Sequence, residues 1–266
     1  MTIVLVHGAW SGSWSWRDVR RLLSAKGYEV IAPTLSGLAE RAHIKPDQVS
    51  LQSHIQDVAG LLHYEDLSRV LLVGHSYGGM VITGAADRMV ERLAGLVYVD
   101  AFLPESGQCL FDIVPPYSRL TQESAAQAHD GGQSVPRAPQ ANMSQSDVQQ
   151  AGMQQAGMQQ NGDAARWAGL FSAQPIGTLR QPYVSVRDAK TMDVSQWPPR
   201  HYALCTAYKG SVFHQMAAKV DGQAGWTFSQ FDAGHDVVRT HPHWVAARIE
   251  EIAQNLEIAK SFSKKL

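Results

Sequence analysis

One short stretch of the chain has the pattern of a nucleophilic serine. Ser76 stands in Gly74-His75-Ser76-Tyr77-Gly78, directly after an apolar run, and small and apolar residues follow it with helical spacing. A strand, a sharp turn and a helix form the context of a nucleophile elbow. Glycines at 74 and 78 permit the strand and helix to close tightly around a strained serine. We therefore predict Ser76 as a nucleophile, with a purely structural glycine-rich turn as the alternative.

A serine hydroxyl is a weak nucleophile and needs a base within hydrogen-bond reach. The chain has eleven histidines, and only position distinguishes them. His235 lies in a Gly-His-Asp loop just beyond the last strand-like run, where the sheet order would bring it over Ser76. His7 is expected to anchor the loop after the first strand, and His75 to point away from the site. His235 is the predicted general base.

The acid partner of this histidine is less evident. Residues 205–213, which follow the penultimate predicted strand, contain no Asp or Glu. Asp100 ends the strand that follows the elbow, and a carboxylate there would reach the same imidazole from a neighbouring strand. We predict Asp100 as the acid, with a loop-capping role as its alternative. Asp221 lies a full helix later, and Asp236 is adjacent to His235 in sequence, so each is a weaker candidate.

A tetrahedral intermediate also needs two donors for its oxyanion. The backbone amide of Tyr77, directly after the nucleophile, is the first expected donor. The second should come from the loop after the first strand, His7-Gly8-Ala9-Trp10, in which we choose the amide of Ala9.

These residues require a framework that gathers several strand ends at one edge. Continuous apolar runs alternate with amphipathic segments, which favours a doubly wound, mostly parallel α/β sheet with ligands at the carboxyl ends of its strands. The expected strands are 2–6, 28–32, 70–73, 93–99, 201–206 and 226–231. The expected helices include 51–63, 78–89, 212–220 and one that begins near 240–242.

The alternation stops between residues 104 and 199, which are rich in Gln, Ser, Ala, Gly and Pro. The segment holds too many large apolar side chains for a solvated linker, so we predict a helical cap or lid at 104–199 inserted in a core of 1–103 and 200–266. A substrate pocket between cap and core is predicted to use Trp10, Phe102, Met153, Met158, Trp167 and Phe171.

Composition narrows the classes of partner. The 266 residues carry a formal net charge of −1 with scattered basic residues, so nucleic acid is not an expected partner. No apolar stretch approaches the roughly 18 residues of a membrane span, and no basic segment precedes the first strand. We expect a cytoplasmic protein that binds a small-molecule ester and no membrane, with a homodimer as an option. Two cysteines, Cys109 and Cys205, lack the spacing of a metal site, and no metal is predicted.

Taken together, the motifs resemble the α/β-hydrolase superfamily. They are His7-Gly8-Ala9-Trp10, Pro33-Thr34-Leu35-Ser36-Gly37, Gly74-His75-Ser76-Tyr77-Gly78-Gly79, Val97-Tyr98-Val99-Asp100-Ala101-Phe102 and Gly234-His235-Asp236. Over about residues 1–105 and 200–260 the chain is similar to small bacterial esterases related to plant methyl esterases and hydroxynitrile lyases. The resemblance implies a cofactor-free Ser-His-acid hydrolase without N-terminal antiparallel strands. It does not extend to the cap, and the acid usual in the family is missing from the loop at 208–211.

Three functions follow from this resemblance. The first is a serine hydrolase that cleaves a small, largely apolar carboxylic ester through an acyl-enzyme. The second is a cofactor-free lyase of the hydroxynitrile lyase type, for which Lys209 would supply an extra cation near the site. The third is a non-catalytic ligand receptor on the same scaffold.

Overall fold

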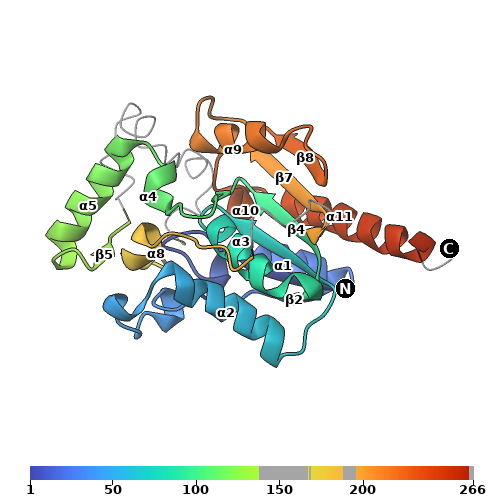
Figure 1. Cartoon of the computed structure of the whole chain (residues 1–266), viewed down its shortest axis with the longest axis horizontal. Helices are drawn as coiled ribbons and strands as arrows, with labels where there is room; N and C mark the ends of the chain where they lie inside the picture. The colour runs from blue at the N-terminus through green and yellow to red at the C-terminus, as the bar shows by residue number, and fades with distance from the viewer. Residues whose placement is uncertain (138–166, 168, 188–195, 264–266) are drawn as a thin grey trace.

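A six-stranded parallel sheet forms the centre of the molecule. The computed structural model describes residues 1–137, 167, 169–187 and 196–263. The strand order is β2-β1-β3-β4-β7-β8, and each neighbouring pair is parallel (Figure 1). The strands are β1 (Thr2–Val6), β2 (Glu29–Ile31), β3 (Val70–His75), β4 (Leu93–Val99), β7 (Arg200–Cys205) and β8 (Trp226–Phe231). The predicted doubly wound α/β fold is confirmed.

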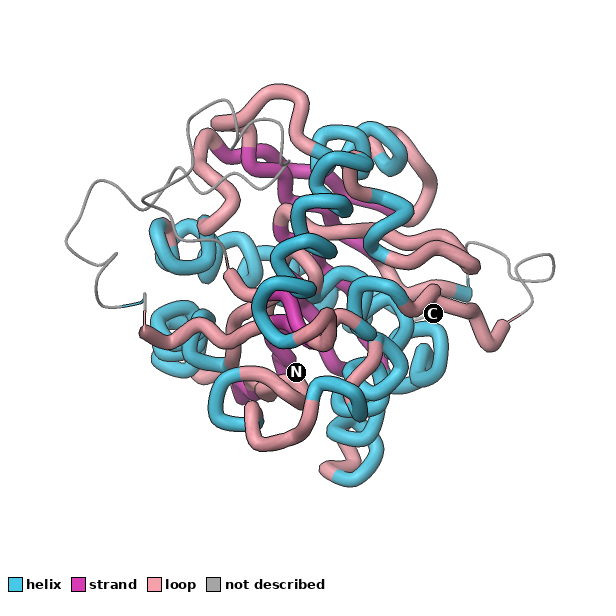
Figure 2. Tube along the Cα trace, turned by 90° about the vertical axis from the view of Figure 1, so that its left-hand side faces the viewer, coloured by secondary structure: helices cyan, strands magenta, loops and turns pink. Residues whose placement is uncertain are grey.

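Helices cover both faces of this sheet (Figure 2). One face packs against α2 (Leu51–Tyr64), α3 (Gly78–Met89) and α9 (Val212–Val220), and the other against α1 (Arg17–Ala25), α10 (Val237–Thr240) and α11 (Pro242–Ser263). Alternate residues of β1 serve the two cores: Val4 and Val6 join the first, and Ile3 and Leu5 the second. This two-sided burial explains why the strands read as continuous apolar runs.

The element boundaries follow the sequence pattern closely. Helix α3 begins at Gly78 and ends at Met89, as predicted, and β4, α9 and β8 also have their predicted bounds. Strand β2 covers only Glu29–Ile31, which is shorter than expected, whereas β3 continues to His75 at the elbow. Four short 3-10 helices are also among the described elements: η1 (Ser13–Trp16), η2 (Ala39–Arg41), η3 (Pro46–Gln48) and η4 (Val90–Arg92).

The regular elements in the described part of residues 104–199 are mostly helices. It contains α4 (Leu110–Ile113), α5 (Pro116–Asp130), α8 (Gly177–Arg180) and an antiparallel pair of β5 (Ser134–Val135) and β6 (Gln174–Pro175). These elements gather on the left-hand side of Figure 1. Several of their apolar side chains, such as Leu110 and Leu179, belong to the same buried cluster as α2 and α3. The division into core and cap stays a prediction.

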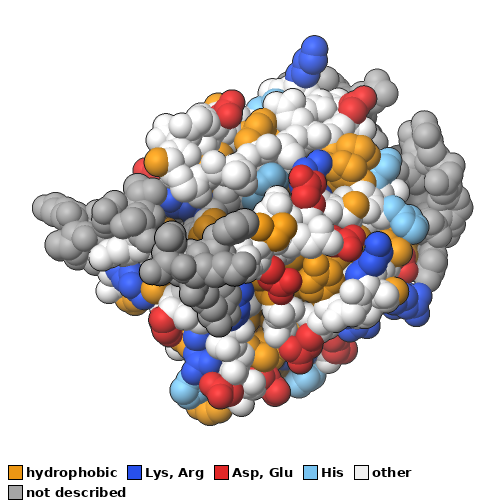
Figure 3. Space-filling view, turned by 90° about the vertical axis from the view of Figure 1, so that its right-hand side faces the viewer, with side chains coloured by type: hydrophobic (Ala, Val, Ile, Leu, Met, Phe, Trp, Pro, Cys, Tyr) orange, Lys and Arg blue, Asp and Glu red, His pale blue; other side chains and the backbone are white. Residues whose placement is uncertain are grey.

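The surface and the helix lengths bear on possible membrane contacts. On the face shown in Figure 3, acidic and basic side chains alternate with apolar ones, without a broad area of one charge. Among the described residues, no helix combines the length and the apolar character needed to cross a membrane.

Candidate active site

Ser76 occupies a strained turn between β3 and α3. Its φ is 54°, in the left-handed region that non-glycine residues rarely adopt. A Cβ at Gly74 would lie 2.8 Å from the backbone of Gly78, and a Cβ at Gly78 would lie 2.6 Å from the carbonyl oxygen of Val6. Only glycine fits at either position, so the two glycines of the motif are required by the close approach of strand and helix.

The structure brings Ser76, His235 and Asp100 together at the carboxyl edge of the sheet. His235 lies between β8 and α10, and its Nε2 is 2.9 Å from Ser76 Oγ. Its Nδ1 is 2.6 Å from Asp100 Oδ2. Because the carboxylate can only accept, Nδ1 carries the proton and Nε2 is left to accept the serine hydroxyl. This tautomer is the one that a general base needs.

Asp100 is held rigidly between two strands. Its backbone N–H donates to the carbonyl oxygen of Ala203 at 2.8 Å, and its Oδ1 accepts the N–H of Cys205 at 3.1 Å. The side chain is nearly fully buried, and the backbone φ of 42° lies in the left-handed region that non-glycine residues rarely adopt. In the strand order β4-β7-β8, the loop that carries His235 follows β8 and reaches back across the end of β7 to Asp100.

The two weaker acid candidates lie elsewhere. Asp236 forms an ion pair with Arg239 in the next turn of chain. Burial raises the pKa of this carboxyl, but the charge and hydrogen bonds of Arg239 outweigh it and the net shift is downward. Asp221 is exposed at the end of α9. Of the three carboxylates, Asp100 is the one in contact with His235.

Two rings enclose the imidazole of His235. Phe213 stacks on one side with its centroid at 4.6 Å and an interplanar angle of 9°. His75 lies at 4.8 Å, and its Nε2–H donates to the carbonyl oxygen of His235 at 2.8 Å. Burial, followed by the nearby His235, lowers the pKa of His75 to about 3, so it remains neutral. The expectation that His75 points away from the site was wrong, because the loop that carries His235 folds back over the end of β3.

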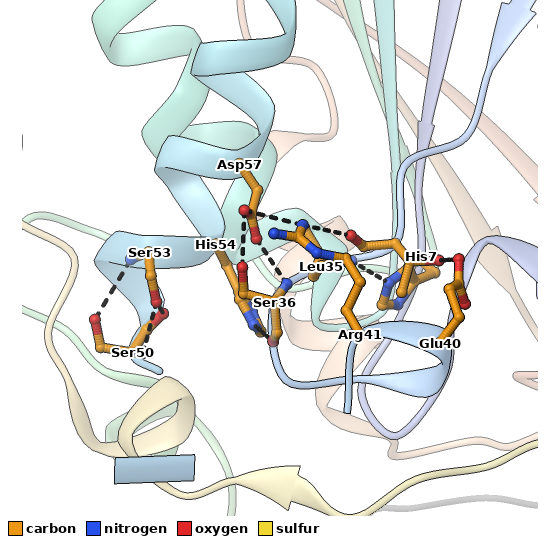
Figure 4. Close-up of polar contacts among 10 residues, drawn as sticks. His7, Leu35, Ser36, Glu40, Arg41, Ser50, Ser53, His54 and Asp57 are labelled. Atoms are coloured by element: carbon orange, nitrogen blue, oxygen red, sulfur yellow. Dashed lines mark hydrogen bonds and ion pairs between the residues drawn. The ribbon is translucent and has the colours of Figure 1, made fainter. Parts of the chain in front are cut away.

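The loop after β1 runs directly against the elbow. A Cβ at Gly8 would lie 3.0 Å from the Cβ of Ser76. His7 donates from Nδ1 to the carbonyl oxygen of Gly8. Its Nε2 accepts the N–H of Leu35 (Figure 4). Burial lowers the pKa of His7 to about 4, so its imidazole is neutral at neutral pH. His7 thus anchors the loop, as expected, and Ala9 and Tyr77 both line the space in front of Ser76.

A largely apolar pocket opens at Ser76. Three of the predicted residues, Trp10, Phe102 and Phe171, line it. Trp167 is not among the lining residues and instead stacks on Trp14 with centroids 5.4 Å apart. The predicted Met153 and Met158 lie outside the described residues. The sequence pattern did not predict the other apolar residues that line the pocket. They belong to α4, α8, α9 and α10 or directly follow α4, and they are Leu110, Val114, Leu179, Val212, Phe213 and Val238.

Two arginines, Arg137 and Arg239, line the pocket. Arg137 lies over the ring of Phe171 with its guanidinium carbon 3.2 Å from the centroid, and Arg239 approaches the same ring at 5.0 Å. Burial lowers the pKa of Arg137 to about 10, and it remains a cation at neutral pH. In the described part of the chain, no group of three or more His, Cys, Asp or Glu side chains could hold a metal ion.

Comparisons with known proteins identify the family of the chain. A model of the alpha/beta hydrolase family matches residues 3–248. The chain belongs to this family. A carbendazim hydrolyzing esterase from Nocardioides sp. (strain SG-4G) is 35 % identical over 247 residues, which are 92 % of this chain and 97 % of that protein. The prediction of a hydrolase-class enzyme with the α/β-hydrolase fold is thereby confirmed.

One plant relative and one solved structure extend the comparison. Salicylic acid-binding protein 2 from Nicotiana tabacum is 35 % identical over 121 residues, 44 % of this chain and 46 % of that protein. A solved extracellular alpha/beta-hydrolase from a Paenibacillus species has a TM-score of 0.74 and 23 % identity, covering 95 % of this chain and 98 % of that chain. The Paenibacillus structure supports the fold alone, and the tobacco protein agrees with the resemblance to plant members of the family stated from the motifs.

Proposed function

We propose that the protein is a serine hydrolase that cleaves a small, largely apolar carboxylic ester through an acyl-enzyme intermediate. The observation that carries the proposal is the continuous line from Ser76 Oγ to His235 Nε2 and from His235 Nδ1 to Asp100, with distances of 2.9 and 2.6 Å. The esterase from Nocardioides, which matches nearly the whole chain, supports an ester as the bond that is cleaved.

In this proposal His235 acts first as a base and then as an acid. Nε2 takes the proton from Ser76 as Oγ attacks the ester carbonyl, and it then returns that proton to the departing alcohol. The Asp100 carboxylate stabilises the transient imidazolium through Nδ1. A water molecule activated by the same histidine then attacks the acyl-enzyme, which releases the acid and restores Ser76.

The oxyanion of each tetrahedral intermediate would be held by two backbone amides. Tyr77 precedes the first residue of α3, and helix N-termini present amides without intrahelical acceptors. Ala9 is the second proposed donor. The next amide, that of Trp10, already donates to Gln174 at 2.8 Å, which favours Ala9 over Trp10. Loss of one such donor costs roughly 2.7–4 kcal/mol of transition-state stabilisation.

The pocket wall suits an aromatic or branched apolar substrate. Phe102 and Phe213 pack edge to face with centroids 4.9 Å apart beside the serine. Aromatic side chains of this kind bind planar apolar groups through stacking and through burial of apolar surface. The compartment, the oligomeric state and the absence of a cofactor stay predictions.

The lyase alternative loses the feature that motivated it. Lys209 is exposed and is not among the residues that line the pocket. The receptor alternative has no specific observation in its favour, since Ser76 and His235 are both in contact and accessible from the pocket.

The deciding experiment is esterase turnover with and without the nucleophile. The purified protein should release p-nitrophenol from a short acyl ester, and Ser76→Ala should abolish this release. A fluorophosphonate probe should label Ser76, located by mass spectrometry. Ser24→Ala, at an exposed position of α1, is the matched control and should retain full turnover. Ester turnover that persists in the Ser76→Ala protein would contradict the proposal.

A further inference from the structure

The backbone of the loop after β1 is held by a segment far away in sequence. Trp10 has a φ of 60°, an unfavourable left-handed conformation for a tryptophan. All three of its polar groups are paired with residues around β5 and β6. Its N–H donates to Gln174 Oε1 at 2.8 Å, its carbonyl oxygen accepts the N–H of Ser172 at 3.0 Å, and its indole N–H donates to the carbonyl oxygen of Val135 at 2.9 Å.

Gln174 connects this loop to the elbow. The side-chain Oε1 of Gln174 accepts the N–H of Trp10. The Nε2 of the same side chain donates to Thr178 Oγ1 at 2.6 Å. Neither Gln174 nor Thr178 has any exposed surface. The Thr178 hydroxyl donates to the carbonyl oxygen of Pro175 at 2.6 Å, and the Thr178 side chain lies against the hydroxyl of Tyr77, the residue whose amide follows the nucleophile.

A second chain of hydrogen bonds begins at the Tyr77 hydroxyl. The Tyr77 hydroxyl donates to His54 Nδ1 at 2.9 Å, and His54 Nε2–H donates to the carbonyl oxygen of Ser36 at 2.8 Å. Asp57 in turn accepts the Ser36 N–H at 2.7 Å, and Figure 4 shows His54 and Asp57 projecting from α2 toward Ser36. Burial lowers the pKa of His54 to about 4, so the neutral tautomer required here persists at neutral pH.

We propose that Gln174 is a positioning residue for the oxyanion-binding amides. Its hydrogen bond from Trp10 fixes the Ala9–Trp10 loop on one side of Ser76. Its hydrogen bond to Thr178, which lies against the Tyr77 hydroxyl, supports the Tyr77 side chain on the other side. This role rests on the proposed hydrolase function. Its physical basis is that an oxyanion donor contributes fully only when it is held at hydrogen-bond distance from the charge that develops in the transition state.

Gln174→Leu removes both hydrogen bonds and nearly preserves the side-chain volume. It leaves the Trp10 amide without its acceptor, and a strained loop without this restraint relaxes. We expect kcat for a p-nitrophenyl ester to fall about 10- to 100-fold, a fraction of the roughly 10²–10³-fold loss that follows removal of a whole donor. KM should stay within about threefold, because the apolar pocket that binds the ground state is untouched.

The matched control is Gln181→Leu. Gln181 Oε1 accepts the N–H of Gln52 at 2.7 Å, so it also joins the 104–199 segment to the core through one backbone amide, but away from Ser76. A merely structural role for Gln174 predicts similar effects of the two changes on thermal stability and on turnover. The positioning role predicts that only Gln174→Leu lowers kcat and weakens binding of a trifluoromethyl ketone, whose adduct with a serine carries an oxyanion, by the same factor.

Tyr77→Phe tests the support of the Tyr77 side chain if Gln174→Leu does not fold. It deletes only the hydroxyl that bonds His54, and it should lower kcat about three- to tenfold and weaken the trifluoromethyl ketone equally, again with little change in KM. A folded Gln174→Leu or Tyr77→Phe protein with kcat and ketone affinity within twofold of the wild type overturns the positioning role alone. A wild-type protein without esterase turnover overturns the proposed function and this role with it.

Discussion

Asp100→Asn is the change that examines the least obvious member of the proposed triad. In the structure, Oδ1 of Asp100 accepts the N–H of Cys205 while Oδ2 accepts from His235 Nδ1. An asparagine that keeps the bond from Cys205 must turn its NH2 group toward Nδ1. The imidazole then accepts at Nδ1 and carries its proton on Nε2, where it can no longer receive the proton of Ser76.

The expected loss is correspondingly large. In a serine protease the equivalent change lowered kcat by roughly 10⁴ through the same tautomer reversal. At 1.36 kcal/mol per factor of ten, this is about 5.4 kcal/mol of transition-state stabilisation. The opposite orientation of the asparagine amide is unfavourable, because it would set the NH2 group against the N–H of Cys205 in a buried position.

The assay is steady-state hydrolysis of a p-nitrophenyl ester, with kcat and KM determined separately. KM should change little, because Asp100 lies behind His235 and is not among the residues that line the pocket. Asp221→Asn makes the same chemical change at an exposed carboxylate and should behave as the wild type. An Asp100→Asn protein that keeps more than a tenth of the wild-type kcat would refute the assignment. So would a folded Asp236→Asn protein with an equal loss.

Two further predictions concern stability. Gly79→Ala would place a Cβ 2.1 Å from the carbonyl oxygen of Phe102 and should destabilise the fold by at least about 1–3 kcal/mol in urea unfolding. Gly60→Ala, whose nearest neighbour lies at 4.0 Å within α2, should instead stabilise by roughly 0.5–1 kcal/mol, and equal effects would contradict the packing argument. Burial lowers the pKa values of His7 and His54 from 6.5 to about 4, so the unfolded chain binds more protons between these values and stability falls as the pH drops through this window. Unfolding midpoints at pH 7 and pH 5.5 should show a loss of roughly 1 kcal/mol per histidine, and an unchanged midpoint would refute the buried neutral state.

Local sequence carried most of the information about the sheet and the elbow. The apolar runs and the helical spacing between them predicted the parallel strands. Helix α3 has its predicted bounds, because a strand followed by glycines and a helical pattern defines this turn strongly. His235 and the His7–Trp10 loop were predicted because both lie directly after strands, and the carboxyl ends of parallel strands meet at one edge.

The surroundings of the site depended on contacts between distant segments. Periodicity did not show that His75 would lie against His235, since that contact depends on how a loop 160 residues later folds back. The lining from α4 and α8 also escaped prediction, because the 104–199 segment has weak periodicity and its apolar residues have no evident common face. Met153 and Met158 stay predictions.

The sequence by itself thus determined the order of the elements, the turn at Ser76 and the strand ends that meet around it. Only the tertiary structure decided which carboxylate contacts His235 and what holds the loop after β1. Asp100 reaches the histidine because β7, about a hundred residues later in the chain, pairs beside β4. Trp10 keeps its strained conformation because Gln174, 164 residues away, accepts its amide proton. Such pairings depend on the packing of whole elements, and no pattern of neighbouring residues encodes them.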